Sequence, residues 1–345
     1  LDALLPQLRQ LDDLFKALFA ARQQRGAIEF ESSDTRILFD EERKISRIVP
    51  VQRNRAHQII EECMIAANVA AAQRVARRKA PAPYRIHEQP DAQKVQALRE
   101  FLAERGLVLG GGDSPSSDDF CKLMRRTAKR PDRQVLHTVI LRSMMQARYS
   151  AENLGHFGLA LEHYGHFTSP IRRYPDLLLH RTIKQLIRKQ KRAAFIYEHS
   201  QIEQAAAHCS MTGRRADEAV RDVTTWLKCE YMHHRVGQAY DGVISGIAAF
   251  GLFVQLDGLF LDGLVHVSQL KNDYYQYEAR HHRLIGDNSG RTYNLGERLR
   301  VRVVRVDLDE RKIDLEIVDE PKGASKGSSR IKRSGSRWKR SNKFS

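Results

Sequence analysis

Residues 166–181 read His-Phe-Thr-Ser-Pro-Ile-Arg-Arg-Tyr-Pro-Asp-Leu-Leu-Leu-His-Arg and gather groups suited to binding an anion; we call them the arginine segment. Ser169 is a good helix cap and Pro170 suits a first helical turn, so the pattern predicts a helix start here. Arg172 and Arg173 then stand where backbone N–H groups already favour negative charge, which predicts a phosphate site. A plain solvated basic helix start is the competing interpretation.

A carboxylate lies one helical turn beyond these arginines. If the helix continues, Arg172, Asp176 and His180 recur at intervals of four residues and share one face. The carboxylate of Asp176 is then expected to hold the guanidinium of Arg172 in a fixed pose. Pro175 is expected to kink this helix, because it removes a backbone donor.

The arginine segment closely resembles the signature of the catalytic domain of the bacterial exoribonuclease II/R family. The resemblance covers nearly the whole chain, since further likeness lies in residues 60–68, 215–219, 221–223 and 226–228. It implies a processive, hydrolytic 3′-to-5′ exoribonuclease of the cytoplasm that releases nucleoside 5′-monophosphates. Its implied partners are single-stranded 3′ ends and structured RNA.

The resemblance also implies roles for single residues. Arg172 matches the arginine that steadies the scissile phosphate, Phe30 the ring that stacks on the 3′-terminal base, and Glu61 a carboxylate that contacts the terminal nucleotide. A strand phenylalanine is more often core and a helix glutamate more often solvated, so the residues alone leave both interpretations open. Contacts with RNA phosphates are expected from three further arginines, although charges on a long helix are usually solvated: Arg173, Arg214 and Arg215.

The chemistry implied by the family is phosphodiester hydrolysis assisted by Mg²⁺, which lowers the pKa of the attacking water and stabilises charge on the leaving oxygen. Such ions need clustered carboxylates. The pairs Asp12-Asp13 and Asp118-Asp119 lack the family's spacing, so we assign no metal ligand in this chain and expect the Asp-rich cluster before Leu1, together with cold-shock RNA-binding domains. We therefore interpret the chain as the C-terminal part of an exoribonuclease that is inactive alone. The alternative is an RNA-binding module without catalytic activity of its own.

Composition agrees with a polyanionic partner. The net charge is +16, but residues 321–345 hold nine Lys or Arg and no Asp or Glu, which leaves +7 for the other 320 residues. This tail is rich in Gly and Ser and is expected to be disordered. It resembles the basic tail of the R branch of the family and would suit ribosomes or RNA-decay proteins as further partners.

Cysteine spacing and hydropathy favour a cytoplasmic protein. The four cysteines form no CxxC pair and are expected to be reduced thiols. No apolar run approaches 18 residues, and the first residues lack the pattern of a signal peptide, so no membrane association is expected.

Hydrophobic periodicity predicts an α+β protein that is mostly helical up to about residue 235. At about residue 236 the sequence changes from helical periodicity to tight alternation with glycine turns. Together with the basic tail, this predicts three parts: catalytic residues 1–235, a barrel domain at 236–320 and the tail at 321–345. Strands are expected at 27–31, 37–39 and 45–49. Helices are expected from residue 4 toward Gly26 and then at 52–79, 91–105, 117–129, 132–148, 169–190 and 199–235.

Residues 239–256, 264–267 and 301–306 alternate in hydropathy between glycine turns, which predicts a small β-barrel. Gly-Ile-Ala-Ala-Phe-Gly-Leu-Phe-Val followed by Asp-Gly-Leu-Val-His-Val-Ser closely resembles the S1 RNA-binding domain, an OB-fold. Strand phenylalanines are often core, but rings on a barrel surface can stack on bases. The resemblance implies RNA contacts for four residues: Phe250, Phe253, His266 and Lys312.

Overall fold

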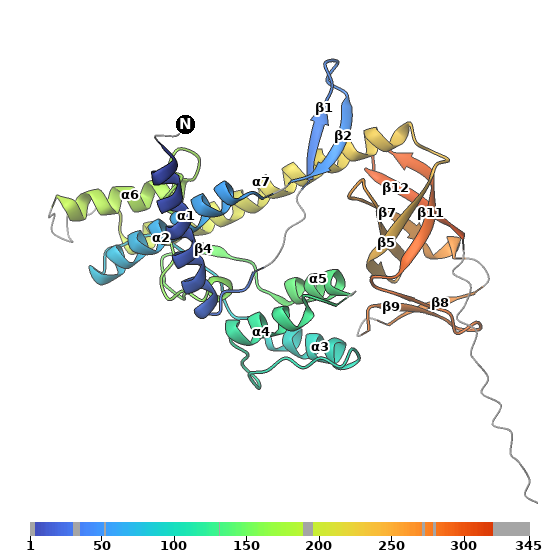
Figure 1. The fold of residues 1–345 in the computed structure, drawn as a ribbon, viewed down its shortest axis with the longest axis horizontal. Coiled ribbons are helices and arrows are strands. Elements are labelled where there is room, and N and C mark those ends of the chain that lie inside the picture. Colours follow the sequence, from blue (N-terminus) through green and yellow to red (C-terminus); the bar gives the residue numbers. More distant parts are fainter. Residues whose placement is uncertain are drawn as a thin grey trace, which may run out of the picture.

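The computed structural model describes residues 4–29, 35–51, 53–130, 132–188, 196–270, 273–278 and 281–319. A mainly helical part and a small closed barrel lie at opposite ends of a long helix, which confirms the α+β fold class (Figure 1). Phe30 and the tail at 321–345 lie outside the described residues, so their predicted roles stay predictions.

The described residues before the barrel include seven α-helices and two short strand pairs. The helices are α1 (Leu5–Gln24), α2 (Arg55–Arg77), α3 (Ala92–Ala103), α4 (Ser117–Thr127), α5 (Arg133–Ser143), α6 (Tyr174–Ile187) and α7 (His199–His233). The strand pairs are β1 (Thr35–Phe39) with β2 (Ile45–Pro50) and β3 (Tyr84–Ile86) with β4 (Arg148–Ser150), and both pairs are antiparallel.

Side-chain caps explain where several helices begin. Asn54 accepts a hydrogen bond from the backbone N–H of His57 at the start of α2, and Ser116 forms a reciprocal capping box with Asp119 at the start of α4. Such caps satisfy N–H groups that have no partner within the helix. They therefore fix the first turn of each helix.

The helix α7 joins the two ends of the molecule (Figure 1). It packs against α6 and β4 at one end and against β11 and β12 of the barrel at the other. Ile202 and Ala206 are buried near its start, and Cys229 and Met232 are buried near its end. Burial of an Ile or Met side chain contributes roughly 1.5–3 kcal/mol, so both ends of α7 are anchored.

The barrel is closed, with strand order β11-β12-β7-β6-β5. Gly251 has no room for a side chain, since a Cβ there would lie 2.3 Å from the carbonyl oxygen of Val265. A three-stranded antiparallel sheet that the sequence analysis did not predict follows β7. The strands are β5 (Ala239–Ala248), β6 (Gly251–Leu256), β7 (Leu261–His266), β8 (Tyr275–Glu278), β9 (Arg283–Gly286), β10 (Thr292–Asn294), β11 (Arg298–Asp307) and β12 (Lys312–Asp319).

Residues after α7 pack on α3 and α5: the turn before β9 contacts α3, and the turn before β11 contacts α5. Gly296 lies so close to Val135 of α5 that a Cβ would come within 2.2 Å of its Cγ2. The ring of His282 meets that of Phe101 on α3 edge to face at 5.5 Å. A cleft of about 630 Å³, lined by both polar and apolar side chains, lies between α5 and strands β5 to β7. Buried side chains of α3, α4, α5 and the barrel belong to one continuous hydrophobic cluster.

Two predicted elements are wrong. The predicted helix at 132–148 ends at Ser143, because Met144 is extended and residues 148–150 pair with β3 as strand β4. Tertiary pairing has overridden helical periodicity here. The described part of the predicted strand at 27–31 is not a strand, although Ala27 and Ile28 are buried.

Candidate nucleic-acid interface

The arginine segment enters α6 through a turn, which corrects its predicted helix start. The helix begins at Tyr174 and not at Ser169, and the backbone N–H of Arg173 bonds to the carbonyl of Ser169 in the preceding turn. Pro175 lies in the first turn of α6, where its missing N–H costs no helical bond, so the predicted kink is also wrong.

Asp176 binds Arg173, so the prediction that it would hold Arg172 is wrong. It is fully buried, and its Oδ1 accepts hydrogen bonds from the backbone N–H of Ser169 and from Nη2 of Arg173, each at 2.8 Å. The cause is the late helix start, which places Arg173 at the N-cap, three residues before Asp176. Within the described residues the exposed side chain of Arg172 has no hydrogen bond or ion pair.

His180 serves as an anchor for the arginine segment. Its ring stacks on Phe167 at 4.1 Å with an angle of 6° between the planes, and its Nε2–H donates to the Phe167 carbonyl at 2.8 Å. It therefore does not share a functional face with Arg172.

A buried polar layer supports the segment. Asn68 of α2 donates to the hydroxyl of Tyr164 at 3.1 Å and accepts from the backbone N–H of Phe167 at 2.9 Å. The hydroxyl of Tyr149 forms a 2.8 Å hydrogen bond with Nδ1 of His166. These bonds tie α2, β4 and the arginine segment together.

The histidines of this layer are uncharged at neutral pH. Burial, reinforced by the guanidinium groups of Arg173 and Arg85, lowers the pKa of His166 to about 3. Burial also lowers the pKa of His156 to about 3, with smaller contributions from His87 and Arg85. The positive charge near the arginine segment is therefore carried by arginines.

The sequence analysis missed Arg85. It lies on β3 directly opposite Tyr149 on β4, and its guanidinium lies 4.8 Å from the centre of the Tyr149 ring. Burial lowers the pKa of Arg85. The sequence contains a pattern that could have indicated Arg85. Tyr84-Arg85-Ile86 is a short alternating run in which the two apolar residues face the core.

Glu61 on α2 lies among arginines. It pairs with Arg53, and its carboxylate lies 3.9 Å from Nη1 of Arg22. The neighbouring Glu62 is buried and bonds to the same Arg22 nitrogen at 2.7 Å. Glu62 thus joins α1 to α2, whereas Glu61 keeps 39% of its side chain exposed and is the more accessible of the two. Its contact with a nucleotide stays a prediction.

Arg214 and Arg215 lie on an exposed stretch of α7. The described residues contain no ion pair between Arg214 and Glu218, which were spaced for one. Neither arginine is held by an acidic side chain there, and their phosphate contacts stay predictions.

Three predicted ring residues share the outer surface of the barrel; we call Phe250, Phe253 and His266 the ring surface. Gly251 pairs with His266 and Phe253 pairs with Leu264 across β6 and β7, so Phe253 and His266 are diagonal neighbours on one face. The alternate residues Leu252, Val254 and Val265 fill the core. The ring of Phe250, 50% exposed, meets that of Phe253 edge to face at 5.8 Å. The structure therefore brings these rings together outside the core.

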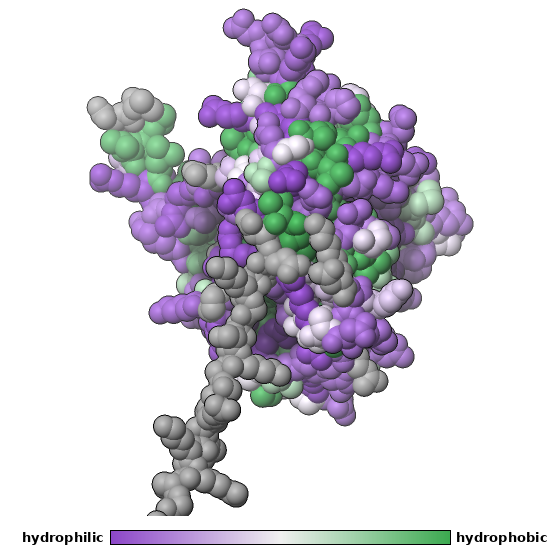
Figure 2. Space-filling model, turned by 90° about the vertical axis from the view of Figure 1, so that its right-hand side faces the viewer, coloured by the Kyte–Doolittle hydropathy of each residue, from purple (hydrophilic) through white to green (hydrophobic). Residues whose placement is uncertain are grey.

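Lys312 lies at the start of β12, next to this surface. It precedes the buried Ile313, and Asp314 pairs with Leu264 of β7, so Lys312 and Asp314 face outward. Its Nζ lies 3.2 Å from the carboxylate of Glu310. The end of the molecule that carries the barrel is mostly hydrophilic, with scattered hydrophobic patches (Figure 2).

The described residues contain no group of three or more His, Cys, Asp or Glu side chains that could hold a metal ion. The described residues therefore do not provide a set of ligands for the Mg²⁺ expected from the family. All four cysteines are free. In the part of the chain that the structure describes, no helix has the length and apolar character needed to cross a membrane.

Comparisons with known proteins agree with this arrangement. An RNB domain model matches residues 2–189, and an S1 RNA binding domain model matches residues 233–318. The chain belongs to the RNB-domain family. Within this family it is similar to ribonuclease R of Escherichia coli K12, with 50% identity over 323 residues, which cover 91% of this chain and 40% of that protein.

Solved structures of ribonuclease R match the fold of this chain. Mycoplasma genitalium RNase R in complex with ribose methylated single-stranded RNA matches with a TM-score of 0.86 and 26% identity, over 92% of this chain and 50% of that one. The same enzyme in complex with double-stranded RNA matches with a TM-score of 0.76 and 25% identity, over 90% and 50%. This chain thus spans about half or less of the length of these relatives.

Proposed function

We propose that this RNB-family chain forms part of a processive, hydrolytic 3′-to-5′ exoribonuclease that releases nucleoside 5′-monophosphates from single-stranded and structured RNA. The observation that carries the proposal is the turn before α6. Asp176 fixes Arg173 there, while Arg172 stays exposed without a bonded partner in the described residues. The similarity to RNase R structures solved with RNA supports RNA as the ligand.

Arg172 is the group that contacts the reacting phosphate in this proposal. A guanidinium presents N–H donors in a planar fork that suits two phosphate oxygens, and it stays charged at any physiological pH. Charge on these oxygens grows as the phosphodiester bond breaks, so the contact strengthens in the transition state. Phe30 and Glu61 are proposed to position the 3′-terminal nucleotide.

In this proposal the barrel binds the part of the RNA strand that leads to the phosphate contacted by Arg172. The rings of Phe250, Phe253 and His266 face outward and can stack on bases of any sequence, and Lys312 can contact the backbone. Arg173, Arg214 and Arg215 are proposed to contact phosphates nearer the reaction centre.

An RNA-binding module without its own catalysis is the second candidate. It is favoured by one observation, the lack of a group of carboxylates suited to a metal ion in the described ranges. The two functions are compatible if the metal ligands belong to another part of the natural protein. We also propose the division at about residue 236, a cytoplasmic location, dependence on Mg²⁺, and contacts of the basic tail with ribosomes or RNA-decay proteins.

The test uses the 345-residue chain and the natural protein that contains it, each with 5′-labelled single-stranded RNA and Mg²⁺. We expect the chain to bind RNA and release no nucleotide. We expect the natural protein to shorten the RNA from its 3′ end and to release nucleoside 5′-monophosphates. Nucleotide release by the chain alone would disprove its inactivity. Failure of both proteins to bind RNA would disprove the RNA function itself.

A further inference from the structure

Two arginines in the polar layer beside Arg172 lie near each other without full neutralisation. The guanidinium of Arg85 on β3 lies 4.8 Å from the centre of the ring of Tyr149, whose hydroxyl bonds to His166 in the arginine segment. Arg173, at the start of α6, is one of the charges that lower the pKa of Arg85. The backbone N–H of Arg85 bonds to the carbonyl of Tyr164, and the charges of Arg85 and Arg173 both contribute to the lowered pKa of His166. Repulsion between two like charges is reduced when an anion lies between or beside them.

Among the described residues, the guanidinium of Arg85 has no hydrogen-bond partner. Its ring contact with Tyr149 at 4.8 Å is the one side-chain interaction that the described part of the chain gives it. A half-buried guanidinium has lost part of its hydration, so five donors without protein acceptors are unfavourable unless a ligand or water fills them. The strand pairing of Arg85 with Tyr149 fixes where this group stands.

Among the described residues, three buried polar atoms of the arginine segment have no hydrogen-bond partner, and two of them are donors. Nε of Arg173 is buried and has no hydrogen bond, although Nη2 of the same side chain bonds to Asp176. Oγ1 of Thr168 is likewise buried and without a partner. Buried donors in native proteins are nearly always satisfied, so these atoms point to a ligand or a solvent molecule.

Nearby acidic groups do not supply the missing acceptor. Asp176 uses one oxygen on Ser169 and Arg173, and its other oxygen is buried without a partner. Asp217 on α7 is near enough to raise the pKa of Arg85, but no ion pair joins them among the described residues. His166 and His156 stay neutral and add no charge. The local balance therefore remains positive.

We propose that Arg85 and Arg173 together bind a backbone phosphodiester of the RNA strand, at a position other than the phosphate that Arg172 contacts. The ligand class follows from the donors: two forked cations suit one singly charged group with two free oxygens. Arg172 is next to Arg173 in the chain and also acts on His166, so one strand can reach both sites. This assignment rests on the proposed function, and it adds a binding residue that the arginine segment does not contain.

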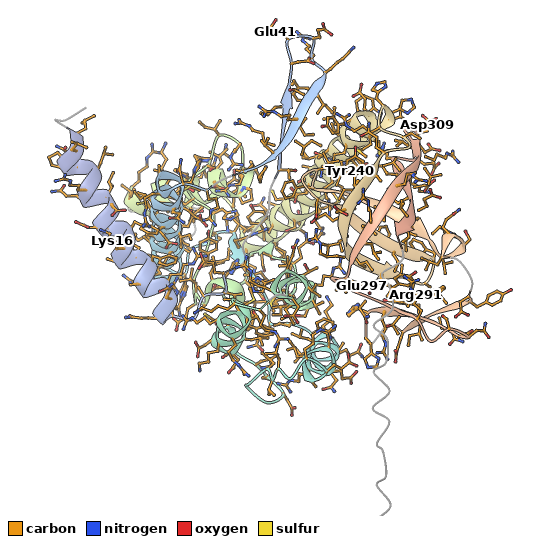
Figure 3. The ribbon with its side chains drawn as sticks, turned by 45° about the vertical axis from the view of Figure 1, so that its right-hand side comes forward. Lys16, Glu41, Tyr240, Arg291, Glu297 and Asp309 are labelled. Atoms are coloured by element: carbon orange, nitrogen blue, oxygen red, sulfur yellow. The ribbon has the colours of Figure 1, made fainter. Side chains whose placement is uncertain are left out.

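The test combines a protein variant with a change in a single RNA phosphate. Binding of single-stranded RNA by the 345-residue chain is measured without Mg²⁺, across a salt series, for wild type, Arg85→Gln and Arg85→Lys. Arg9→Gln is the matched control, because Arg9 is exposed and lies on α1, which carries Lys16 and lies at the edge of the molecule away from the barrel (Figure 3). Melting temperatures are recorded for every variant.

We expect Arg85→Gln to weaken binding about tenfold and to flatten the slope of log affinity against log salt by about 0.7, the value for one lost contact with a single strand. Arg9→Gln should change neither. A set of RNAs, each with one phosphate replaced by an uncharged methylphosphonate, should show one position where neutralisation weakens binding by wild type and not by Arg85→Gln. Arg85→Lys should keep most of the salt slope.

Three results would overturn the site. In the first, wild type binds RNA, and Arg85→Gln has the same affinity and salt slope as Arg9→Gln. Arg85 would then not contact RNA, and the proposed function would be unaffected. Weaker binding with a lower melting temperature and an unchanged methylphosphonate profile would make Arg85 a structural residue. Wild type that fails to bind RNA would instead refute the proposed function, and this site with it.

Discussion

The carboxylate of Asp176 binds the guanidinium of Arg173 at 2.8 Å and leaves the adjacent Arg172 exposed. The same carboxylate oxygen accepts the backbone N–H of Ser169, so one buried acid fixes both the turn and one of its two arginines. The two neighbouring arginines therefore differ: Arg173 is held in place by Asp176, and Arg172 is exposed.

Asp176→Asn should lower the free energy of unfolding by about 3 kcal/mol, because it leaves a partly buried guanidinium without its counter-charge. Urea denaturation measures the change. Asp13→Asn removes a carboxylate that pairs with Lys16 on the surface of α1, and it should have little effect. Equal effects of the two substitutions would mean that the buried pair does not stabilise the turn.

Stability should fall as pH drops from about 6.5 toward 5. His166 and His156 have a pKa of about 3 in the folded state and about 6.5 when unfolded, so in this range the unfolded chain binds more protons. The stability that these two neutral histidines contribute is fully present above pH 6.5 and is lost progressively as the pH falls below it. His166→Gln should reduce the slope by up to about 1.4 kcal/mol per pH unit. An unchanged slope in urea titrations at several pH values would show that His166 is protonated in the folded protein.

The ring surface should contribute to RNA affinity and little to folding. Phe253→Ala with His266→Ala should weaken RNA binding by several kcal/mol at most, at roughly 1–3 kcal/mol per stacked base, with a nearly unchanged melting temperature. Leu252→Ala, next to Phe253 but fully buried, should instead cost about 2–5 kcal/mol of stability. Early melting of the double variant with intact affinity would identify these rings as core.

The contact between the barrel and α5 depends on a glycine. Gly296→Ala should destabilise the protein by roughly 1–3 kcal/mol more than Gly258→Ala does. Both glycines have positive φ, but only a Cβ at Gly296 meets Val135, whereas a Cβ at Gly258 meets open space. Adding Val135→Ala to Gly296→Ala should recover part of the loss in thermal melting. Equal losses for the two glycine variants would show that backbone strain alone decides the effect.

Local patterns predicted most of the elements, and long-range contacts account for what they missed. Apolar periodicity indicated α1, α2 and α7, and glycine-punctuated alternation indicated the barrel, because both patterns act within a few residues. The start of α6, in contrast, depends on the hydrogen bonds that the buried Asp176 accepts from Ser169 and Arg173. The polar layer joins Asn68 to Phe167, 99 positions away, and no local pattern contains that information.

The most direct test of the account is the effect of Arg172→Ala on cleavage compared with binding, measured in the natural protein that contains this chain. Single-turnover cleavage of single-stranded RNA should slow by about 100-fold or more, while the Kd for RNA measured without Mg²⁺ should change less than about tenfold, because the contact strengthens as the bond breaks. Arg172→Lys should recover part of the rate. A cleavage rate that stays at the wild-type value, or that falls only in proportion to RNA affinity, would contradict the role of Arg172 at the reacting phosphate.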